Sequence, residues 1–204
     1  MMRRMLIVPA LLAVLVLAGF SAGASEDPAT WTLDRSHSQV KFKVRHLGIS
    51  NVEGSFGTFD ITLRFDPADL KTVQTTAEID ATSIDTGNER RDGHLRSDDF
   101  FAADEHPKLT FVSTGVEQID GNRFKLAGDL TIRGTTKPVV LDAELLGTAS
   151  NGGKTVAAFT ATTTINRFDY GLKWDRLTEA GGLMVGENVQ ITIDMEVVKQ
   201  DAEG

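Results

Sequence analysis

Alternation of apolar and polar residues with a period of two is the feature of this 204-residue chain that most restricts its fold. The clearest run, 189–197, alternates five apolar residues with four polar ones, and runs at 40–45, 59–65 and 124–133 follow the same pattern. Weaker runs cover 73–82, 108–117, 138–147 and 156–166, and Trp31–Leu33 opens the series. Such alternation is typical of strands with one buried face, whereas no stretch of 12 or more residues shows a strong helical period.

Short turn sequences separate these runs. Asp120-Gly121-Asn122 and Asn151-Gly152-Gly153 supply the positive φ that tight hairpins need, and Asp66-Pro67 and residues 135–138 mark two further turns. Because the turns are short and the strands are long, we expect strands paired in chain order rather than a Greek-key sandwich. The pattern predicts one all-β domain, folded as an antiparallel up-and-down barrel of eight strands. At this size the interior is either filled by side chains or holds one small ligand, and periodicity does not decide between them.

Two short helices are expected besides the strands, at 67–70 and at 88–102. The second belongs to a long charged segment, 83–101, which breaks the alternation and contains Ile84, Leu95 and Phe100. These apolar residues need burial, so we expect the segment to form a short helix and loop lying across one end of the barrel. Long loops in compact domains are usually functional.

Composition excludes several classes of protein. The absence of cysteine rules out disulfides, thiolate metal sites and a cysteine nucleophile. With 21 Lys and Arg against 29 Asp and Glu, the net charge of −8 argues against a nucleic-acid partner, because phosphate neutralisation needs clustered cations. The apolar fraction of 41% suffices for a packed core and argues against disorder.

Residues 1–24 have the anatomy of a secretory signal peptide. Arg3 and Arg4 precede an apolar stretch from Met5 to Gly19, and residues 22–24 fit a small-residue cleavage site. The apolar stretch is short for a membrane span and contains Pro9. We therefore expect cleavage and export to the periplasm, which leaves 19 basic and 29 acidic residues and a net charge of −10.

Several motifs in chain order resemble the YceI-like family of exported proteins. Singly they are weak, but together they span nearly the whole of the chain after residue 24. The two departures are His106, where an aromatic residue is commoner, and Tyr170, where Phe is common. The matching segments are Trp31-x-Leu33-Asp34-x-x-His37-Ser38 with Phe42 and His46, Gly54-x-Phe56-x-x-Phe59, Arg91-Asp92-x-His94-Leu95 with Asp99-Phe100-Phe101, His106-Pro107 with Phe111 and Ser113, Gly128-x-Leu130-Thr131-Ile132-Arg133-Gly134 with Pro138-Val139, and Arg167-x-Asp169-Tyr170-Gly171.

The resemblance implies that residues 25–204 form a lipocalin-like barrel whose interior binds an isoprenoid lipid, such as a polyprenyl pyrophosphate or a quinone-like amphiphile. It implies a binding protein for storage or transport, not an enzyme, with no cofactor and no catalytic residues. A homodimer is compatible with the resemblance, although the residue pattern does not address it. The alternatives are a His-dependent or metal-dependent hydrolase and a stress-related structural module with a filled core.

The candidate tail-binding residues are the inward-facing apolar positions of the strands. Each methylene group moved out of water contributes about 0.8 kcal/mol, so a long tail needs no specific hydrogen bond. The pattern alone favours a filled core in which these residues pack on one another. The resemblance to the family instead implies that they line a cavity. They are Phe42, Val44, Phe59, Ile61, Ile79, Phe111, Leu126, Leu130, Ile132, Phe159 and Ile165.

The candidate head-group residues are cationic or carry imidazole donors, which bind phosphate or quinone oxygens. Two structural alternatives stay open, namely an Arg91–Asp92 pair that fixes the loop and an Arg167–Asp169 latch. The candidates are His46, Arg91, His94, Arg96 and Arg167.

The histidines suggest no metal site. His37, His46, His94 and His106 are separated by 9, 48 and 12 residues, which matches no compact ligand motif. The Ser36-His37-Ser38 run is as compatible with the start of a strand as with catalysis. The glycine-rich segment 174–186 looks like a mobile flap, and its apolar residues suggest contact with a membrane or a second subunit.

Overall fold

A computed structural model describes residues 28–179 and 181–201, so the predicted signal peptide lies outside the described residues. Within these ranges the chain forms ten strands, one α-helix and two 3₁₀ helices. The strands are β1 (Ala29–His46), β2 (Ser50–Phe56), β3 (Phe59–Asp66), β4 (Asp69–Asp80), β5 (Ile84–Asp85), β6 (Lys108–Asp120), β7 (Arg123–Ile132), β8 (Thr135–Asn151), β9 (Lys154–Asn166) and β10 (Val185–Lys199). The helices are η1 (Ala81–Ser83), α1 (Glu89–Arg96) and η2 (Arg167–Tyr170).

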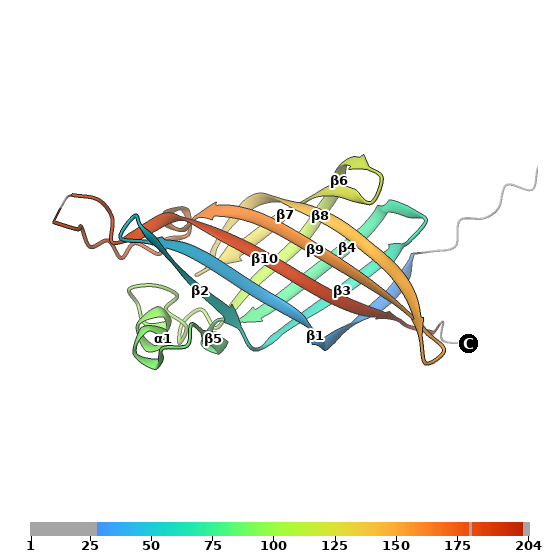
Figure 1. Ribbon diagram of the computed structural model, residues 1–204, viewed down its shortest axis with the longest axis horizontal. Coiled ribbons are helices and arrows are strands. Elements are labelled where there is room, and N and C mark those ends of the chain that lie inside the picture. The colour runs from blue at the N-terminus through green and yellow to red at the C-terminus, as the bar shows by residue number, and fades with distance from the viewer. Residues whose placement is uncertain (1–27, 180, 202–204) are drawn as a thin grey trace, which may run out of the picture.

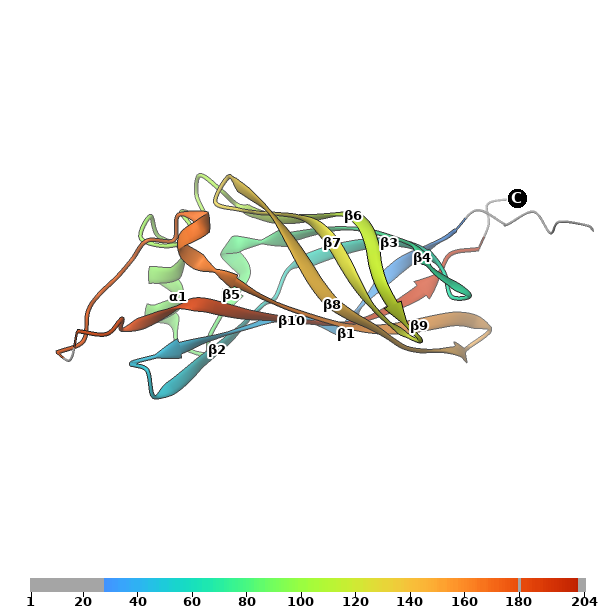
Figure 2. The same cartoon turned by 90° about the horizontal axis from the view of Figure 1, so that it is seen from above.

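All strand pairs are antiparallel, and the sheet closes on itself where β10 pairs with β1 (Figure 1). β2 and β3 both pair with β1, so together they act as one interrupted strand of the barrel. In the same way β5 continues β4 after η1 and pairs with β2. The ten segments thus make eight barrel strands in chain order, which confirms the predicted up-and-down barrel with a short helix at one end (Figures 1 and 2).

The predicted alternation places the core inside the barrel. On β3, Phe59, Ile61, Leu63 and Phe65 are buried while the residues between them are exposed. β7 alternates in the same manner from Phe124 to Ile132. Because successive side chains of a strand point to opposite faces, each of these rows faces the barrel axis.

Aromatic packing fills the end of the barrel where β1 begins. Trp31 stacks on Phe65 with ring centroids 4.6 Å apart, and its indole nitrogen donates to the Phe65 carbonyl oxygen at 3.2 Å. Phe65 also meets the Phe159 ring edge-on at 5.0 Å. Trp31 and Phe65 are at most 1% exposed, so this end of the barrel is closed by packed rings.

The helix predicted at 67–70 is wrong, and the one predicted at 88–102 is shorter than expected. Asp66 accepts a hydrogen bond from the Ala68 N–H, which forms a turn, and β4 begins at Asp69. The real helix, α1, begins after Asn88, whose side chain caps it by accepting from the Arg91 N–H. Among the described helices, none has the length and apolar character needed to cross a membrane.

Two glycines let phenylalanine rings lie directly on the sheet. A Cβ atom at Gly128 would sit 2.3 Å from the Phe111 ring, and one at Gly54 would sit 2.5 Å from the Phe42 ring. Both rings belong to the predicted tail-binding set. The glycines therefore set how far these rings project into the barrel.

We predict that Gly128→Ala destabilises the protein by about 1–3 kcal/mol, because the added methyl group displaces the Phe111 ring. Gly115→Ala on β6 is the matched control, since a Cβ there meets no atom within 4 Å. Urea denaturation of both variants measures the difference. Equal stabilities would show that the ring moves without strain.

Candidate binding cavity

Two apolar cavities lie along the barrel axis. The inner cavity has a volume of about 100 Å³ and is lined by all eight barrel strands, among them β6, β7 and β10. The outer cavity, of about 90 Å³, lies nearer to α1. The two share five lining residues and therefore form successive parts of one apolar channel. The shared residues are Phe42, Phe56, Leu109, Ile132 and Ile191.

The predicted tail-binding residues fall on this channel with one exception. Phe59 is buried but does not line either cavity. The outer cavity is lined by Phe42, Val44, Ile132 and Ile165. The inner cavity is lined by Phe42, Ile61, Ile79, Phe111, Leu126, Leu130, Ile132 and Phe159.

Segments outside the barrel strands cover the outer cavity, and the apolar residues of these segments are absent from the predicted tail-binding set. We call α1, residues 97–107 and residues 171–184 the mouth segments; Figures 1 and 2 show α1 and the long connection before β10 at the same end of the barrel. Leu95, Phe100, Phe101 and Leu172 from these segments line the outer cavity. The sequence did indicate that the apolar residues of 83–101 are buried. It did not indicate that they line a cavity.

Arg167 is the one predicted head-group residue that lines the channel, and it is 3% exposed. Its guanidinium donates to the carbonyl oxygens of Leu172, Val185 and Gly186 at 2.5–3.1 Å. It thereby joins both ends of the 171–184 segment, in place of the expected Arg167–Asp169 latch. Burial lowers the pKa of Arg167 below its usual value, with Asp175 and Glu187 partly offsetting this.

Tyr170 lies beside Arg167 in the lining of the outer cavity and is 2% exposed. Its hydroxyl is buried and has no hydrogen-bond partner, the one such side-chain atom in the described ranges. Burial raises the pKa of Tyr170 to about 12. The phenol therefore stays protonated at any ordinary pH.

Arg91 and Arg96, both predicted to hold a head group, are bound to the backbone. Arg91 donates to the side-chain and backbone oxygens of Thr86, and Asp92 accepts from the Thr86 N–H at 3.0 Å. Arg96 donates to the carbonyl oxygens of Thr82 and Ile84. These side chains fix the approach of the chain to α1, and neither lines the channel.

The two histidines of the head-group set lie at the mouth end but not on the channel. His94 pairs with Asp99 at 2.8 Å and meets the rings of Phe100 and Trp174 edge-on, at 5.1 and 5.4 Å. This aromatic cluster connects α1 with residues 171–184. His46 ends β1 and pairs with Val185 on β10.

Arg133 also joins the mouth segments, a role that its place in a family motif did not predict. It sits in the β7–β8 turn with a φ of 48°. Its Nη1 lies within hydrogen-bond distance of the carbonyl oxygens of Asp98, Phe100 and Gly171. Only the folded structure reveals this role, because the partners are 33 to 38 residues distant.

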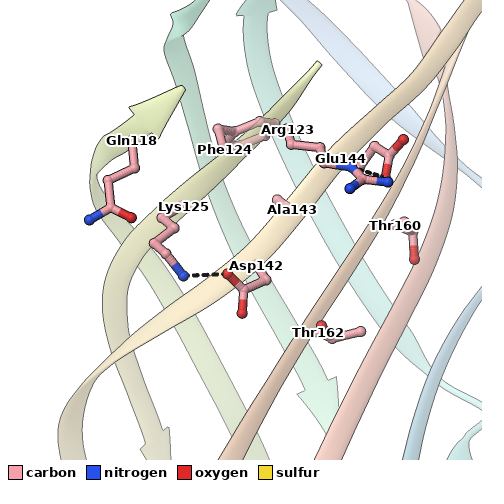
Figure 3. Close-up of a pocket in the computed structure, with 9 residues that line it drawn as sticks. All are labelled: Gln118, Arg123, Phe124, Lys125, Asp142, Ala143, Glu144, Thr160 and Thr162. Atoms are coloured by element: carbon pink, nitrogen blue, oxygen red, sulfur yellow. Dashed lines mark hydrogen bonds and ion pairs between the residues drawn. The ribbon is translucent and has the colours of Figure 1, made fainter. Parts of the chain in front are cut away.

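A polar depression of about 410 Å³ on β7, β8 and β9 offers less for binding (Figure 3). Lys125 pairs with Asp142 and Arg123 with Glu144 across β7 and β8. These pairs lie on the solvent side of the strands, while Phe124 and Ala143 between them point into the barrel. Exposed ion pairs of this kind contribute little to stability. The depression is therefore the outer surface of the barrel wall between paired side chains.

The motif around His37 forms a bulge in β1, where the register with β10 shifts between Asp34 and Gln39. The Ser38 hydroxyl donates to the Asp34 carbonyl oxygen and accepts from the Glu196 N–H. The hydroxyl thereby takes the place of a backbone hydrogen bond that the bulge removes from the β1–β10 pairing.

His37 pairs with the Asp34 carboxylate at 3.0 Å, and the Glu196 carboxylate is 4.0 Å away. Within the described ranges, Asp34, His37 and Glu196 are the one group of three His, Asp or Glu side chains that lie close enough together to bind a common metal ion. Ser36 and Asp34 both approach the same nitrogen of His37, Nδ1. A catalytic triad needs two different ring nitrogens, so the arrangement is not a triad.

A closed antiparallel barrel with an apolar channel under a helix defines a lipocalin-like barrel fold. The family model described as "YceI-like domain" matches residues 31–197, and the chain belongs to this family. A UPF0312 protein of Staphylococcus epidermidis is 40% identical over 168 residues, covering 81% of this chain and 95% of the relative.

Solved structures agree with this assignment. A YceI protein of Campylobacter jejuni is 35% identical with a TM-score of 0.67, and the match covers 83% of this chain and 98% of that protein. A polyisoprenoid-binding domain from Saccharophagus degradans is 18% identical and shares the fold, with a TM-score of 0.58 and coverage of 85% and 99%.

The bulge generates a pH prediction. Hydrogen bonds from Ser36 and then His37 lower the Asp34 pKa to about 2, and the Asp34 carboxylate raises the His37 pKa above 6.5. Asp34 therefore stabilises the fold above pH 3.8 and loses this effect as the pH falls towards 2. His37 stabilises it below pH 6.5 and loses this effect as the pH rises through the folded pKa.

His37→Gln should therefore lower the melting temperature more at pH 5 than at pH 8.5, measured by circular dichroism. Asp34→Asn is the control and should lower the His37 pKa in an NMR titration. An unchanged titration curve would contradict the pairing.

Proposed function

We propose that the protein is an exported carrier that holds an isoprenoid lipid in the barrel channel. The observation that carries the proposal is the pair of linked cavities with an almost wholly apolar lining. An isoprenoid tail presents only apolar surface, so its burial there is favourable at about 25 cal/mol per Å². The Saccharophagus degradans neighbour, described as polyisoprenoid-binding, supports the same ligand class.

The channel must widen to take such a ligand. Ligand pockets usually enclose about 300–1,000 Å³, whereas the two cavities measure about 90 and 100 Å³. The wall formed by β10 can supply this space, because Val189, Ile191, Ile193 and Met195 are only partly buried. A methionine side chain adapts easily to a new shape. We propose that tail binding displaces these side chains and leaves the strand pairing intact.

The mouth end carries the apolar residues for lipid exchange. Ile49 in the β1–β2 turn is 83% exposed and Leu177 in the 171–184 segment is 64% exposed. These two loops touch, since the Leu47 N–H donates to the Met184 carbonyl oxygen at 2.8 Å. Exposed aliphatic residues at a channel mouth suit transient contact with a membrane that supplies the lipid. The predicted signal peptide at 1–24 would place this exchange in the periplasm.

Native mass spectrometry of the protein recovered from the periplasm tests the proposal. We expect a mature chain that begins at Ser25 and carries a prenyl lipid. Ala161→Phe should weaken lipid binding about tenfold or more, since its ring fills the inner cavity and excludes at least two methylene groups. Ala149→Phe on the exposed face of β8 should bind normally. Protein that is consistently empty and takes up no prenyl lipid would contradict the proposal.

We further predict that the Ile49→Ser/Leu177→Ser variant takes up lipid from phosphatidylethanolamine–phosphatidylglycerol vesicles about tenfold more slowly, because it loses two membrane contacts. Leu146→Ser is the matched control, since Leu146 is 58% exposed on β8, away from the mouth segments. A vesicle transfer assay measures the rates. If the wild type elutes as a dimer in size-exclusion chromatography and the double variant as a monomer, these residues form a subunit contact instead.

A further inference from the structure

The bulge near the start of β1 brings two carboxylates face to face. Asp34 on β1 lies directly opposite Glu196 on β10 in the register of the two strands. Their neighbours Leu33 and Val197 are buried, so both carboxylates lie on the outer face of the barrel. Like charges directly opposite each other on neighbouring strands are destabilising. A cation held between the two strands would remove this repulsion.

Lysine and arginine do not supply this cation. Within the described ranges, Asp34 and Glu196 form no ion pair with either residue type. Their side chains are 28% and 29% exposed, so water reaches them only in part. Asp60 and Glu78 also oppose each other, on β3 and β4, but each of these two pairs with an arginine or a lysine. The opposed carboxylates at the bulge therefore lack the compensation that a similar pair has elsewhere in the barrel.

His37 supplies a third ligand atom at the same place. Its Nδ1 lies 3.0 Å from Asp34 Oδ2 and 4.0 Å from Glu196 Oε1, and the three ligand atoms all lie within 4.8 Å of one another. Zinc bonds of about 2.0–2.2 Å to imidazole nitrogen and carboxylate oxygen place the ligand atoms of a tetrahedron about 3.4 Å apart. The three atoms therefore need only small side-chain movements to bind one zinc ion together.

Ser36 holds the Asp34 carboxylate in place for this role. The Ser36 backbone N–H and hydroxyl both donate to Asp34 Oδ1, at 2.9 and 2.6 Å. The other oxygen, Oδ2, is thereby turned towards His37 Nδ1. Hydrogen bonds of this kind orient the ligating carboxylates of metal sites.

The donor set selects the kind of metal. An imidazole with two carboxylates suits zinc and similar transition metals, whereas calcium and magnesium prefer oxygen ligands alone. The His37 side chain is 65% exposed, so water can complete the coordination. We propose that Asp34, His37 and Glu196 form a binding site for zinc or a similar divalent transition metal. On binding, the ion replaces the proton that His37 donates to Asp34.

The site bridges the two strands that close the barrel. Asp34 and His37 belong to β1 and Glu196 belongs to β10, and the bulge interrupts the backbone pairing at this point. A metal ion bound by both strands therefore fastens the closure and stabilises the folded chain by mass action. None of the three residues lines either cavity, so the site does not depend on lipid binding.

Isothermal titration calorimetry of untagged, metal-free protein with zinc chloride tests the site. We expect one zinc ion bound per chain, and much weaker binding of calcium chloride. At a zinc concentration about 100 times the dissociation constant, the melting temperature should rise by about 5–10 °C. His37→Gln and Glu196→Gln should each weaken zinc binding about tenfold or more, because each removes one of the three ligands.

His46→Gln is the matched control, since His46 lies at the other end of β1 and its loss should leave zinc binding unchanged. Ser36→Ala keeps all three ligand atoms and should weaken zinc binding about tenfold, so it tests the site even if the loss of a ligand prevents folding. Circular dichroism without metal shows which variants fold.

Three results would overturn the proposal or part of it. If the wild type binds no zinc, or if the folded Ser36, His37 and Glu196 variants bind it as tightly as the wild type, the site is refuted. If calcium binds as tightly as zinc, the role of the imidazole is refuted. If zinc binds at the site but leaves the melting temperature unchanged, the fastening of the closure is refuted.

Discussion

The pairing of the first barrel strand with the last is the interaction on which the rest of this structure depends. β1 and β10 are in register from Trp31 and Lys199 to His46 and Val185, interrupted by the bulge at 35–38. This pairing removes the free edges of the sheet and encloses the apolar face of every strand. The Asp34–His37 pair and the Ser38 hydroxyl maintain it where the ladder is broken. In a chain without cysteine, closure takes the place of disulfide cross-links.

The arginines at the mouth end show a second common theme. Arg91, Arg96, Arg133 and Arg167 all donate to backbone carbonyl oxygens of irregular segments. These segments lack a strand ladder, and buried carbonyl groups need donors from elsewhere. A guanidinium meets this need well because it carries five donors. The basic cluster that suggested a phosphate site in the sequence is therefore largely the framework that holds the mouth segments over the channel.

The fold was more predictable from the sequence than the site. Alternation on β3, β7 and β10 fixed which residues face inward, because side chains of a strand alternate strictly between its faces. For the same reason ten of the eleven predicted tail-binding residues line the channel, and Phe59 is the exception. Residues such as Leu172, Phe101 and Arg133 were not recovered, since they belong to irregular segments in which no periodicity relates sequence to direction.

The sequence by itself determined the barrel, its strand order and its apolar interior, since period-two patterning and short turns are local signals that each strand carries alone. Only the tertiary structure decided that the interior keeps a channel, because packing depends on how rows from eight strands meet. It also decided that Tyr170 is buried without a partner beside Arg167. Nothing in the sequence around Tyr170 shows this, as the residues that line the outer cavity with it come from distant parts of the chain, among them β1, β10 and the segment after α1.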